Sequence, residues 1–316
     1  MRKLEEFCAV RIITYCVMGN HFHLLLEIPE RGTLPPLGEE GLLRLLPLLY
    51  DRATVETIAS RLEAARKSGN ELEVKAILDS FEARRGDLSV FLKELKQRFS
   101  IFMNRRLGRV GTFWEGPFRS VLVEGGSEAL HAVAAYIDLN PVRAGLVKVP
   151  EDYRWSGYGE AMGTGKWAEK SRSRLCLIQP ESLERPGSAD DTRGWETTLD
   201  RYRRLLYLEG RAVAGDGRET GTLGRPGIDP DLVDEVVEGR KRMSLPEILR
   251  RKVRYFSDGT VLGSAAFVDA AAEALKARGG VGRKRKTGAR KMQGGDWGPI
   301  RVLRDLKVRV FDPPLK

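Results

Sequence analysis

The chain has 316 residues and a hydrophobic share of 41%, enough apolar material for about two globular domains. Its 54 Lys and Arg residues outnumber its 44 Asp and Glu residues, and the net charge of +10 favours a polyanionic partner, with nucleic acid first. The three cysteines lack CxxC spacing, which argues against a disulfide framework and a thiolate zinc site, and no stretch approaches the roughly 18 apolar residues of a membrane span. We therefore expect a cytoplasmic, nucleoid-associated protein with no membrane partner.

A β-hairpin is predicted near the N-terminus. Residues 9–18 and 21–28 have strand composition, and Gly19-Asn20 between them is favourable turn chemistry. His21 and His23 are two apart on the second strand, so their imidazoles point to one face, with Phe22 and alternate leucines on the other. Two adjacent imidazoles could offer one nitrogen each to a metal ion, although such a pair without a further ligand can also be an ordinary polar sheet face.

Helices are predicted for the next segment. A loop at residues 29–36 leads into a helical insertion at about residues 38–86, and Asp87 is a suitable N-cap for a helix over residues 88–104. An apolar stripe runs along that helix, made of Leu88, Phe91, Leu92, Leu95, Phe99 and Phe102. The aromatic residues at 113–118 are predicted to belong to the core rather than to stack on bases, and they precede a short strand at 121–123.

Basic residues on this helix and beyond it are the candidate DNA contacts. They lead into a glycine-containing loop that could follow a phosphate backbone, although a charged helix face can equally be solvated surface. The candidates are Lys96, Arg98, Arg105, Arg106, Arg109, Arg119 and Arg143, together with the run Arg283, Lys284, Arg285 and Lys286.

A further helix begins after the N-cap Ser127 and extends to about Asn140, where Pro141 opposes its continuation. Tyr136 and Asn140 are four apart on it and share a face. Residues 159–195 are predicted to be a linker. Residues 196–316 are predicted to form a mainly helical, basic C-terminal region, with helices near 195–209 and 230–239 and a capping box at 244–247.

These residues combine into a candidate phosphoryl-transfer site. If the helix lies over the histidine face of the hairpin, His21, His23 and the amide oxygen of Asn140 could hold a divalent ion, and Tyr136 could attack a phosphodiester. A phenol is mostly protonated at neutral pH and needs help from a cation or a base. The softness of two imidazole ligands suits manganese better than magnesium, although magnesium is the metal that most commonly binds phosphates. Zinc could bind without supporting turnover.

The chain resembles the REP-associated tyrosine transposases, a branch of the single-tyrosine HUH endonucleases. Three segments carry the resemblance, Tyr15–Leu26, Tyr136–Val147 and Asp152–Tyr158, and Asn104–Arg106 and Gly111–Ser120 also fit. The resemblance implies an α+β fold with a ferredoxin-like antiparallel sheet in a domain at residues 1–158. It also implies that His21 and His23 bind the metal with Asn140 as third ligand, and that Tyr136 is the nucleophile. The implied activity is metal-dependent cleavage and rejoining of single-stranded DNA beside hairpins of repeated extragenic palindromes.

The chain departs from the family pattern at its start. Family members begin with a strand and a helix before the hairpin, and only about eight residues stand there, so we expect that strand and helix to be missing. The alternative function is therefore a truncated or domesticated protein that binds DNA hairpins without cutting them. An RNA-binding module also fits the charge but leaves the site unexplained. Either a monomer or a homodimer, with the Tyr136 helix donated by a second subunit, is compatible with the sequence.

Overall fold

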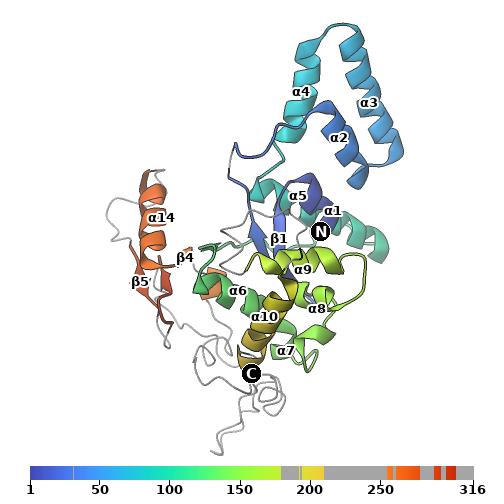
Figure 1. The fold of residues 1–316 in the computed structure, drawn as a ribbon. Helices are drawn as coiled ribbons and strands as arrows, with labels where there is room; N and C mark the ends of the chain where they lie inside the picture. The colour runs from blue at the N-terminus through green and yellow to red at the C-terminus, as the bar shows by residue number, and fades with distance from the viewer. Residues whose placement is uncertain are drawn as a thin grey trace, which may run out of the picture. The chain divides into compact units, whose positions relative to one another are not determined.

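A computed structural model describes residues 1–30, 32–178, 192, 194–209, 255–258, 261–277, 288–292 and 297–303. Helices and short strands are mixed along the chain, which confirms the expected α+β class (Figure 1). Two compact units are present. Unit 1 comprises Met1–Ile12 and Leu26–Phe118, and unit 2 comprises Ile13–Leu25 and Arg119–Lys316. These units do not follow the expected domain boundaries at 158 and 195.

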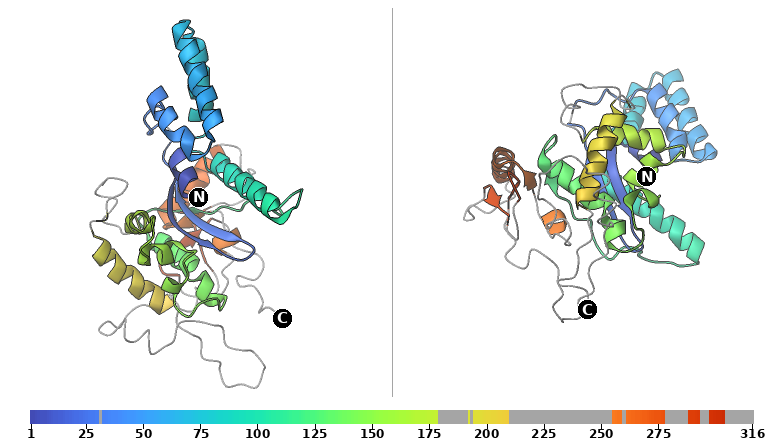
Figure 2. Two further views of the ribbon diagram at one scale, coloured as in Figure 1. Left: turned by 90° about the vertical axis from the view of Figure 1, so that its right-hand side faces the viewer. Right: turned by 60° about the horizontal axis from the view of Figure 1, so that its bottom comes forward.

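The hairpin predicted from the Gly19-Asn20 turn is present. Strand β1 (Arg11–Val17) pairs with β2 (Phe22–Glu27), and the ribbon they form is seen in Figure 2. The amide of Met18 donates to the carbonyl of His21 (2.8 Å) across the two turn residues. On β2 the buried side chain is Leu25, whereas Phe22 and Leu24, expected on the buried face, are only partly covered.

Unit 1 is mainly helical and contains the predicted insertion. Its elements are α1 (Arg2–Phe7), α2 (Glu39–Leu45), the 3-10 helix η1 (Leu46–Leu48), α3 (Arg52–Lys67), α4 (Glu71–Glu82) and α5 (Leu88–Leu107). Asp51, Asn70 and Asp87 cap α3, α4 and α5 by accepting a hydrogen bond from a backbone amide. The helices of the insertion enclose their own small core of Leu42, Leu46, Leu62, Ala65, Val74 and Ile77.

The apolar stripe predicted along α5 is buried only at its beginning. Phe91 and Leu92 are buried, whereas Phe99 and Phe102 are exposed. Phe113 and Trp114, which were expected in the core, are only half-buried, and Phe118 is exposed.

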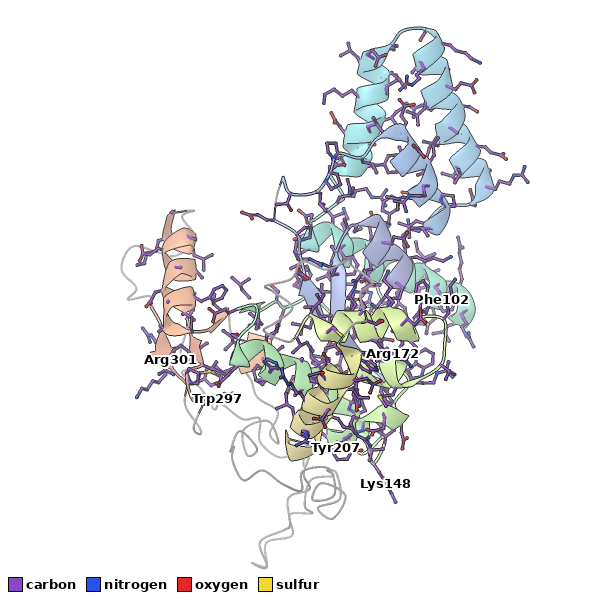
Figure 3. All side chains as sticks on the ribbon, viewed as in Figure 1. Phe102, Lys148, Arg172, Tyr207, Trp297 and Arg301 are labelled. Carbon is purple, nitrogen blue, oxygen red and sulfur yellow. The ribbon has the colours of Figure 1, made fainter. Side chains whose placement is uncertain are left out.

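Unit 2 combines helices with a four-stranded sheet. Its helices are α6 (Glu128–Asp138), α7 (Asn140–Arg143), η2 (Pro150–Asp152), α8 (Gly157–Met162), α9 (Ala168–Cys176), α10 (Trp195–Glu209), α13 (Tyr255–Asp258) and α14 (Ala265–Ala277). The sheet has the order β3-β4-β6-β5, formed by β3 (Leu122–Val123), β4 (Val261–Gly263), β5 (Arg290–Lys291) and β6 (Arg301–Val302). Tyr207 and Trp297, labelled in Figure 3, are both buried in the core of this unit.

The strands of this sheet join distant parts of the chain. Strand β3 pairs in parallel with β4, with Leu122 opposite Val261, and β4 pairs antiparallel with β6, with Leu262 opposite Val302. Within the described residues the C-terminal region is mainly helical, as expected, but it also contributes three short strands to the sheet and shares a core with α6. Strands of two or three residues are too short to show a period in the sequence.

The segment predicted to be a linker is helical over its first half. Helices α8 and α9 lie there, and Leu175 and Ile178 are fully buried. Helix α9 buries the polar residues Ser171, Ser173 and Arg174. Because its buried face is partly polar, the sequence shows no clear hydrophobic period there. The predicted helix at 230–239, the capping box at 244–247 and the basic run at 283–286 lie outside the described residues.

Candidate functional site

Three of the predicted site residues lie together in unit 2. The rings of His21 and His23 are adjacent at the start of β2, with centroids 5.0 Å apart and nearly perpendicular planes. The ring of Tyr136, from α6, lies 5.8 Å from that of His23. The structure therefore brings the hairpin histidines and a tyrosine more than a hundred residues away into one cluster.

The hydrogen bonding of His21 favours one ring nitrogen for ligand binding. Its Nδ1 lies 2.6 Å from Oδ1 of Asn20 in the turn. Because an amide oxygen only accepts, Nδ1 is the donor in this contact, and Nε2 is the nitrogen that the neutral ring would offer to a metal ion. A neighbouring acceptor that fixes the tautomer in this way is the usual support of a metal-binding imidazole.

Asn140 is held one turn beyond Tyr136, but not on the same continuous helix. Helix α6 ends at Asp138, and α7 begins at Asn140 with a proline in its first turn. The side-chain Nδ2 of Asn140 donates to the carbonyl oxygens of Tyr136 (2.8 Å) and Ile137 (3.3 Å). These bonds orient the amide group, and within the described residues its Oδ1 accepts no hydrogen bond.

Tyr136 is covered by two residues for which sequence reasoning gave another role or none. The ring of Phe256, from α13, lies 4.9 Å from that of Tyr136, and the guanidinium carbon of Arg143 lies 5.0 Å from its centroid. Arg143 Nη1 also donates to the carbonyl oxygen of Tyr136 (3.0 Å). As a result only 5% of Tyr136 is exposed. Phe256 is 120 residues from Tyr136 in the sequence, and no local signal links the two.

Asp138 anchors the end of α6 to three other elements. Its carboxylate accepts hydrogen bonds from Thr14 Oγ1 on β1 (2.9 Å), from Tyr202 Oη on α10 (2.7 Å) and from the backbone amide of Tyr158 on α8 (3.2 Å). Burial raises the pKa of this carboxyl group to about 7, although the three donors favour its charged form and oppose the rise. Asp138 thus fixes the helix that carries Tyr136.

The family-like segment Asp152–Tyr158 holds the end of β1. Tyr153 Oη donates to the carbonyl of Val17 (2.6 Å), and the amide of Val17 donates to the carbonyl of Trp155 (2.9 Å). Gly157 lies so close to β1 that a Cβ on it would be 2.2 Å from Thr14 Oγ1. These contacts position the strand that leads into the histidines, which is a structural role.

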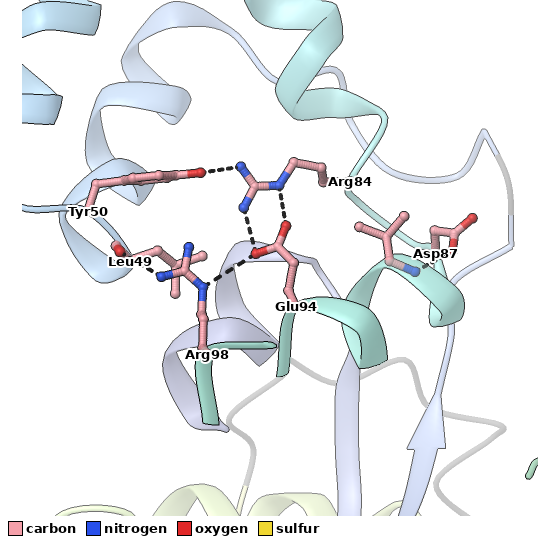
Figure 4. A network of polar contacts seen from close by, with 7 residues as sticks. Leu49, Tyr50, Arg84, Asp87, Glu94 and Arg98 are labelled. Atoms are coloured by element: carbon pink, nitrogen blue, oxygen red, sulfur yellow. Dashed lines mark hydrogen bonds and ion pairs between the residues drawn. The ribbon is translucent and has the colours of Figure 1, made fainter. Parts of the chain in front are cut away.

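The candidate DNA contacts differ in how they are placed. Arg98 belongs to a network in which it donates to the carbonyl of Leu49 (3.0 Å) and pairs with Glu94 (3.5 Å), which in turn binds Arg84 (Figure 4). Lys96 donates to the carbonyl of Gly116 (2.6 Å). Arg143 contacts Tyr136, as described above. Four candidates have exposed side chains: Arg105, Arg106, Arg109 and Arg119. The remaining four, at 283–286, lie outside the described residues.

His21 and His23 present two adjacent imidazoles beside Tyr136, whereas the hydrogen bonds of Asn140 are to the backbone of α6 and not to either histidine. Imidazoles suit transition metals, whereas an amide oxygen suits magnesium or manganese, so a set of His21, His23 and Asn140 would fit manganese better than magnesium. Among the described residues, no three His, Cys, Asp or Glu side chains gather in a way that could hold a metal, so a carboxylate ligand is not part of the arrangement.

Comparison with known proteins finds no similar protein. The chain matches no protein-family model, no curated protein and no solved structure. In the part of the chain that the structure describes, no helix combines the length and the apolar character that crossing a membrane requires.

Proposed function

We propose that the protein is a metal-dependent single-stranded DNA endonuclease and strand transferase of the single-tyrosine HUH type, with Tyr136 as nucleophile. The observation that carries the proposal is the contact between Tyr136 and His23, with His21 next to it. A phenol can act as the nucleophile of covalent phosphoryl transfer, and two imidazoles beside it can hold a metal ion that stabilises the phosphate. The proposed family is the REP-associated tyrosine transposases, and the proposed fold is their ferredoxin-like sheet.

The residues of the chain divide the chemistry between them. Tyr136 Oη would attack the phosphorus atom, the bond from phosphorus to the leaving strand would break, and that strand would depart with a free hydroxyl group. The phosphotyrosine bond keeps the energy of the broken phosphodiester, so attack by a hydroxyl of another strand end would release Tyr136 and rejoin the DNA. Arg143, 5.0 Å from the ring, supplies a positive charge that favours an anionic phosphate at this place.

His21, His23 and Asn140 would hold the divalent ion, magnesium or manganese. When bound, the ion supplies Lewis-acid stabilisation of the charge that develops on the phosphate oxygens. Asn20 orients the His21 ring through the 2.6 Å contact, and the bonds from Asn140 to the backbone of α6 orient its amide. The chain's own contribution is thus to align ligands and nucleophile before DNA arrives.

The test is covalent trapping. The purified protein is incubated with a labelled single-stranded hairpin taken from the sequence beside its own gene, with manganese or magnesium, and analysed on a denaturing gel. We expect a protein–DNA adduct that chelator abolishes and that the Tyr136→Phe variant does not form. Tyr50→Phe, which removes a hydroxyl group in unit 1, is the matched control and should form the adduct as the wild type does.

Two results would contradict the proposal. An adduct that persists in Tyr136→Phe would place the nucleophile elsewhere. Hairpin binding with no adduct, under either metal, would favour the alternative function, a DNA-hairpin-binding protein without cleavage activity. Mass spectrometry of the digested adduct would identify the modified residue directly.

A further inference from the structure

The second half of α5 presents aromatic side chains to solvent in unit 1. Phe99 is 38% exposed and Phe102 is 56% exposed, and they are three residues apart, so they are neighbours on one face of the helix (Figure 3 labels Phe102). Val110, just beyond the helix, is 96% exposed. Exposed apolar side chains grouped in this way mark an interaction surface more often than isolated ones do.

The loop after α5 adds two further aromatic rings to this surface. Phe113 and Trp114 pack against Phe99, with ring centroids 5.3 Å and 5.5 Å from it. Trp114 Nε1 donates to the carbonyl of Lys96 (3.1 Å), and Asn104 Nδ2 donates to the carbonyl of Gly111 (2.9 Å). The loop is therefore fastened to the helix, and the rings of Phe99, Phe113 and Trp114 pack together, with Phe102 one helical turn after Phe99 on the same face of α5. We name Phe99, Phe102, Phe113 and Trp114 the α5 platform.

The charge around the α5 platform is strongly positive. Between residues 94 and 118 the basic residues are Lys96, Arg98, Arg105, Arg106 and Arg109, and the acidic residues are Glu94, which pairs with Arg98, and Glu115. Arg106 follows Phe99 by seven residues and Phe102 by four, which places it on the same face of α5. Its side chain is exposed, as are those of Arg105 and Arg109.

We propose that the α5 platform binds single-stranded DNA by stacking unpaired bases on its rings while the adjacent arginines contact the phosphates. Every base has a π-face, so such a surface accepts a strand with little regard to sequence. A second copy of this chain is a poorer occupant, because the same basic groups would face each other across the contact. The choice of DNA over RNA rests on the proposed function, whereas the stacking does not depend on cleavage.

The experiment distinguishes the contribution of the bases to binding from that of the phosphates. Binding of a labelled oligothymidylate of about 15 nucleotides and of an abasic strand of equal length is measured by fluorescence anisotropy. The full chain is used in the Tyr136→Phe background with chelator, so that no cleavage occurs. The variants are Phe102→Ala, the conservative Phe102→Tyr, and the control Leu72→Ala, which removes a side chain that is 82% exposed elsewhere in unit 1.

We expect Phe102→Ala to weaken oligothymidylate binding by about 5- to 150-fold, the effect of losing one stacked base, and to leave abasic binding unchanged. Phe102→Tyr should retain the affinity because it retains the ring, and Leu72→Ala should behave as the wild type does. Equal losses for both strands would overturn the proposal. So would tighter binding of the corresponding ribo-oligomer, or a dimer that Phe102→Ala dissociates without changing DNA binding. If the protein forms the covalent adduct but binds oligothymidylate and the abasic strand equally well, base stacking on the α5 platform is refuted and the proposed cleavage is not. If it binds oligothymidylate more tightly than the abasic strand but forms no adduct, the proposed cleavage is refuted and base stacking is not.

Discussion

The buried carboxyl group of Asp138 gives a quantitative prediction about stability. An aspartate in an unfolded chain has a pKa near 3.9, whereas burial raises the pKa of Asp138 to about 7 in the folded protein. A raised folded-state pKa contributes stability that is fully present below the unfolded pKa and is lost as pH rises through the folded one. From about pH 5 to pH 7 the unfolded chain has lost this proton while the folded protein keeps it, and each pH unit of that difference costs about 1.4 kcal/mol of stability. Above about pH 7 the loss stops, so the total between about pH 5 and pH 8 is roughly 3 kcal/mol.

The perturbation is Asp138→Asn, which keeps the side chain's size and removes its titration. The free energy of unfolding of the wild type and the variant is measured by urea denaturation in the presence of chelator from about pH 5 to pH 8. We expect the variant to gain roughly 3 kcal/mol relative to the wild type as the pH rises across that window. Asp152→Asn, at an exposed position, is the control and should show no such trend.

A wild-type-minus-variant difference that stays constant from about pH 5 to pH 8 would refute the reasoning. It would mean that the three hydrogen bonds from Thr14, Tyr202 and Tyr158 stabilise the charged carboxylate as fully as burial penalises it. A folded-state pKa lowered by these donors would give the same constant difference, because the change in stability would then fall below about pH 4.

Three further substitutions test the contacts that hold the elements together, each by urea denaturation. Asp87→Ala should cost about 1 kcal/mol, because it removes the N-cap of α5. Gly157→Ala should cost about 1–3 kcal/mol, because the added Cβ would meet Thr14 Oγ1 at 2.2 Å and push α8 away from β1. Arg84→Met should cost about 2 kcal/mol, because it leaves Glu94, 16% exposed, without its bidentate partner (Figure 4).

The substitutions at Gly157 and Arg84 each have a matched control. Gly165→Ala adds a Cβ where no atom lies within 4 Å, and Arg52→Met removes an ion pair from a side chain that is 92% exposed. Both should change the free energy of unfolding by less than about 0.5 kcal/mol. If a control lowers the free energy of unfolding as much as its test variant does, the loss of stability is due to the type of substitution and not to the contact that the test variant removes.

Local chemistry made the hairpin and several helices predictable. Gly19-Asn20 specifies a two-residue turn, and Asp87 offers the carboxylate that caps α5, so both elements form where the sequence indicates them. The side chains of Tyr136 and His23 were expected to meet on chemical grounds, and their rings are in contact. Whether they cleave DNA stays a prediction.

The features that were not predicted depend on distant partners. Phe256 contacts Tyr136 across 120 residues of sequence, and Asp138 is held by Thr14, Tyr202 and Tyr158 from three different elements. No local period records such contacts, because each is satisfied by tertiary packing. The exposed second half of α5 was also missed, since a hydrophobic stripe shows which residues could be buried but not whether a partner covers them.

The parallel pairing of β3 with β4 has a consequence for synthesis. Leu122 pairs with Val261, and the ring of Tyr136 contacts that of Phe256. Neither contact can form until most of the chain has been synthesised and has left the ribosome. At about 5–20 residues per second, the 120 residues between Tyr136 and Phe256 take roughly 6–24 s to translate. During that interval the nascent chain carries its tyrosine and histidines without the aromatic cover of Phe256. The arrangement around Tyr136 is therefore completed late in synthesis, and a chain released before residue 256 would lack it.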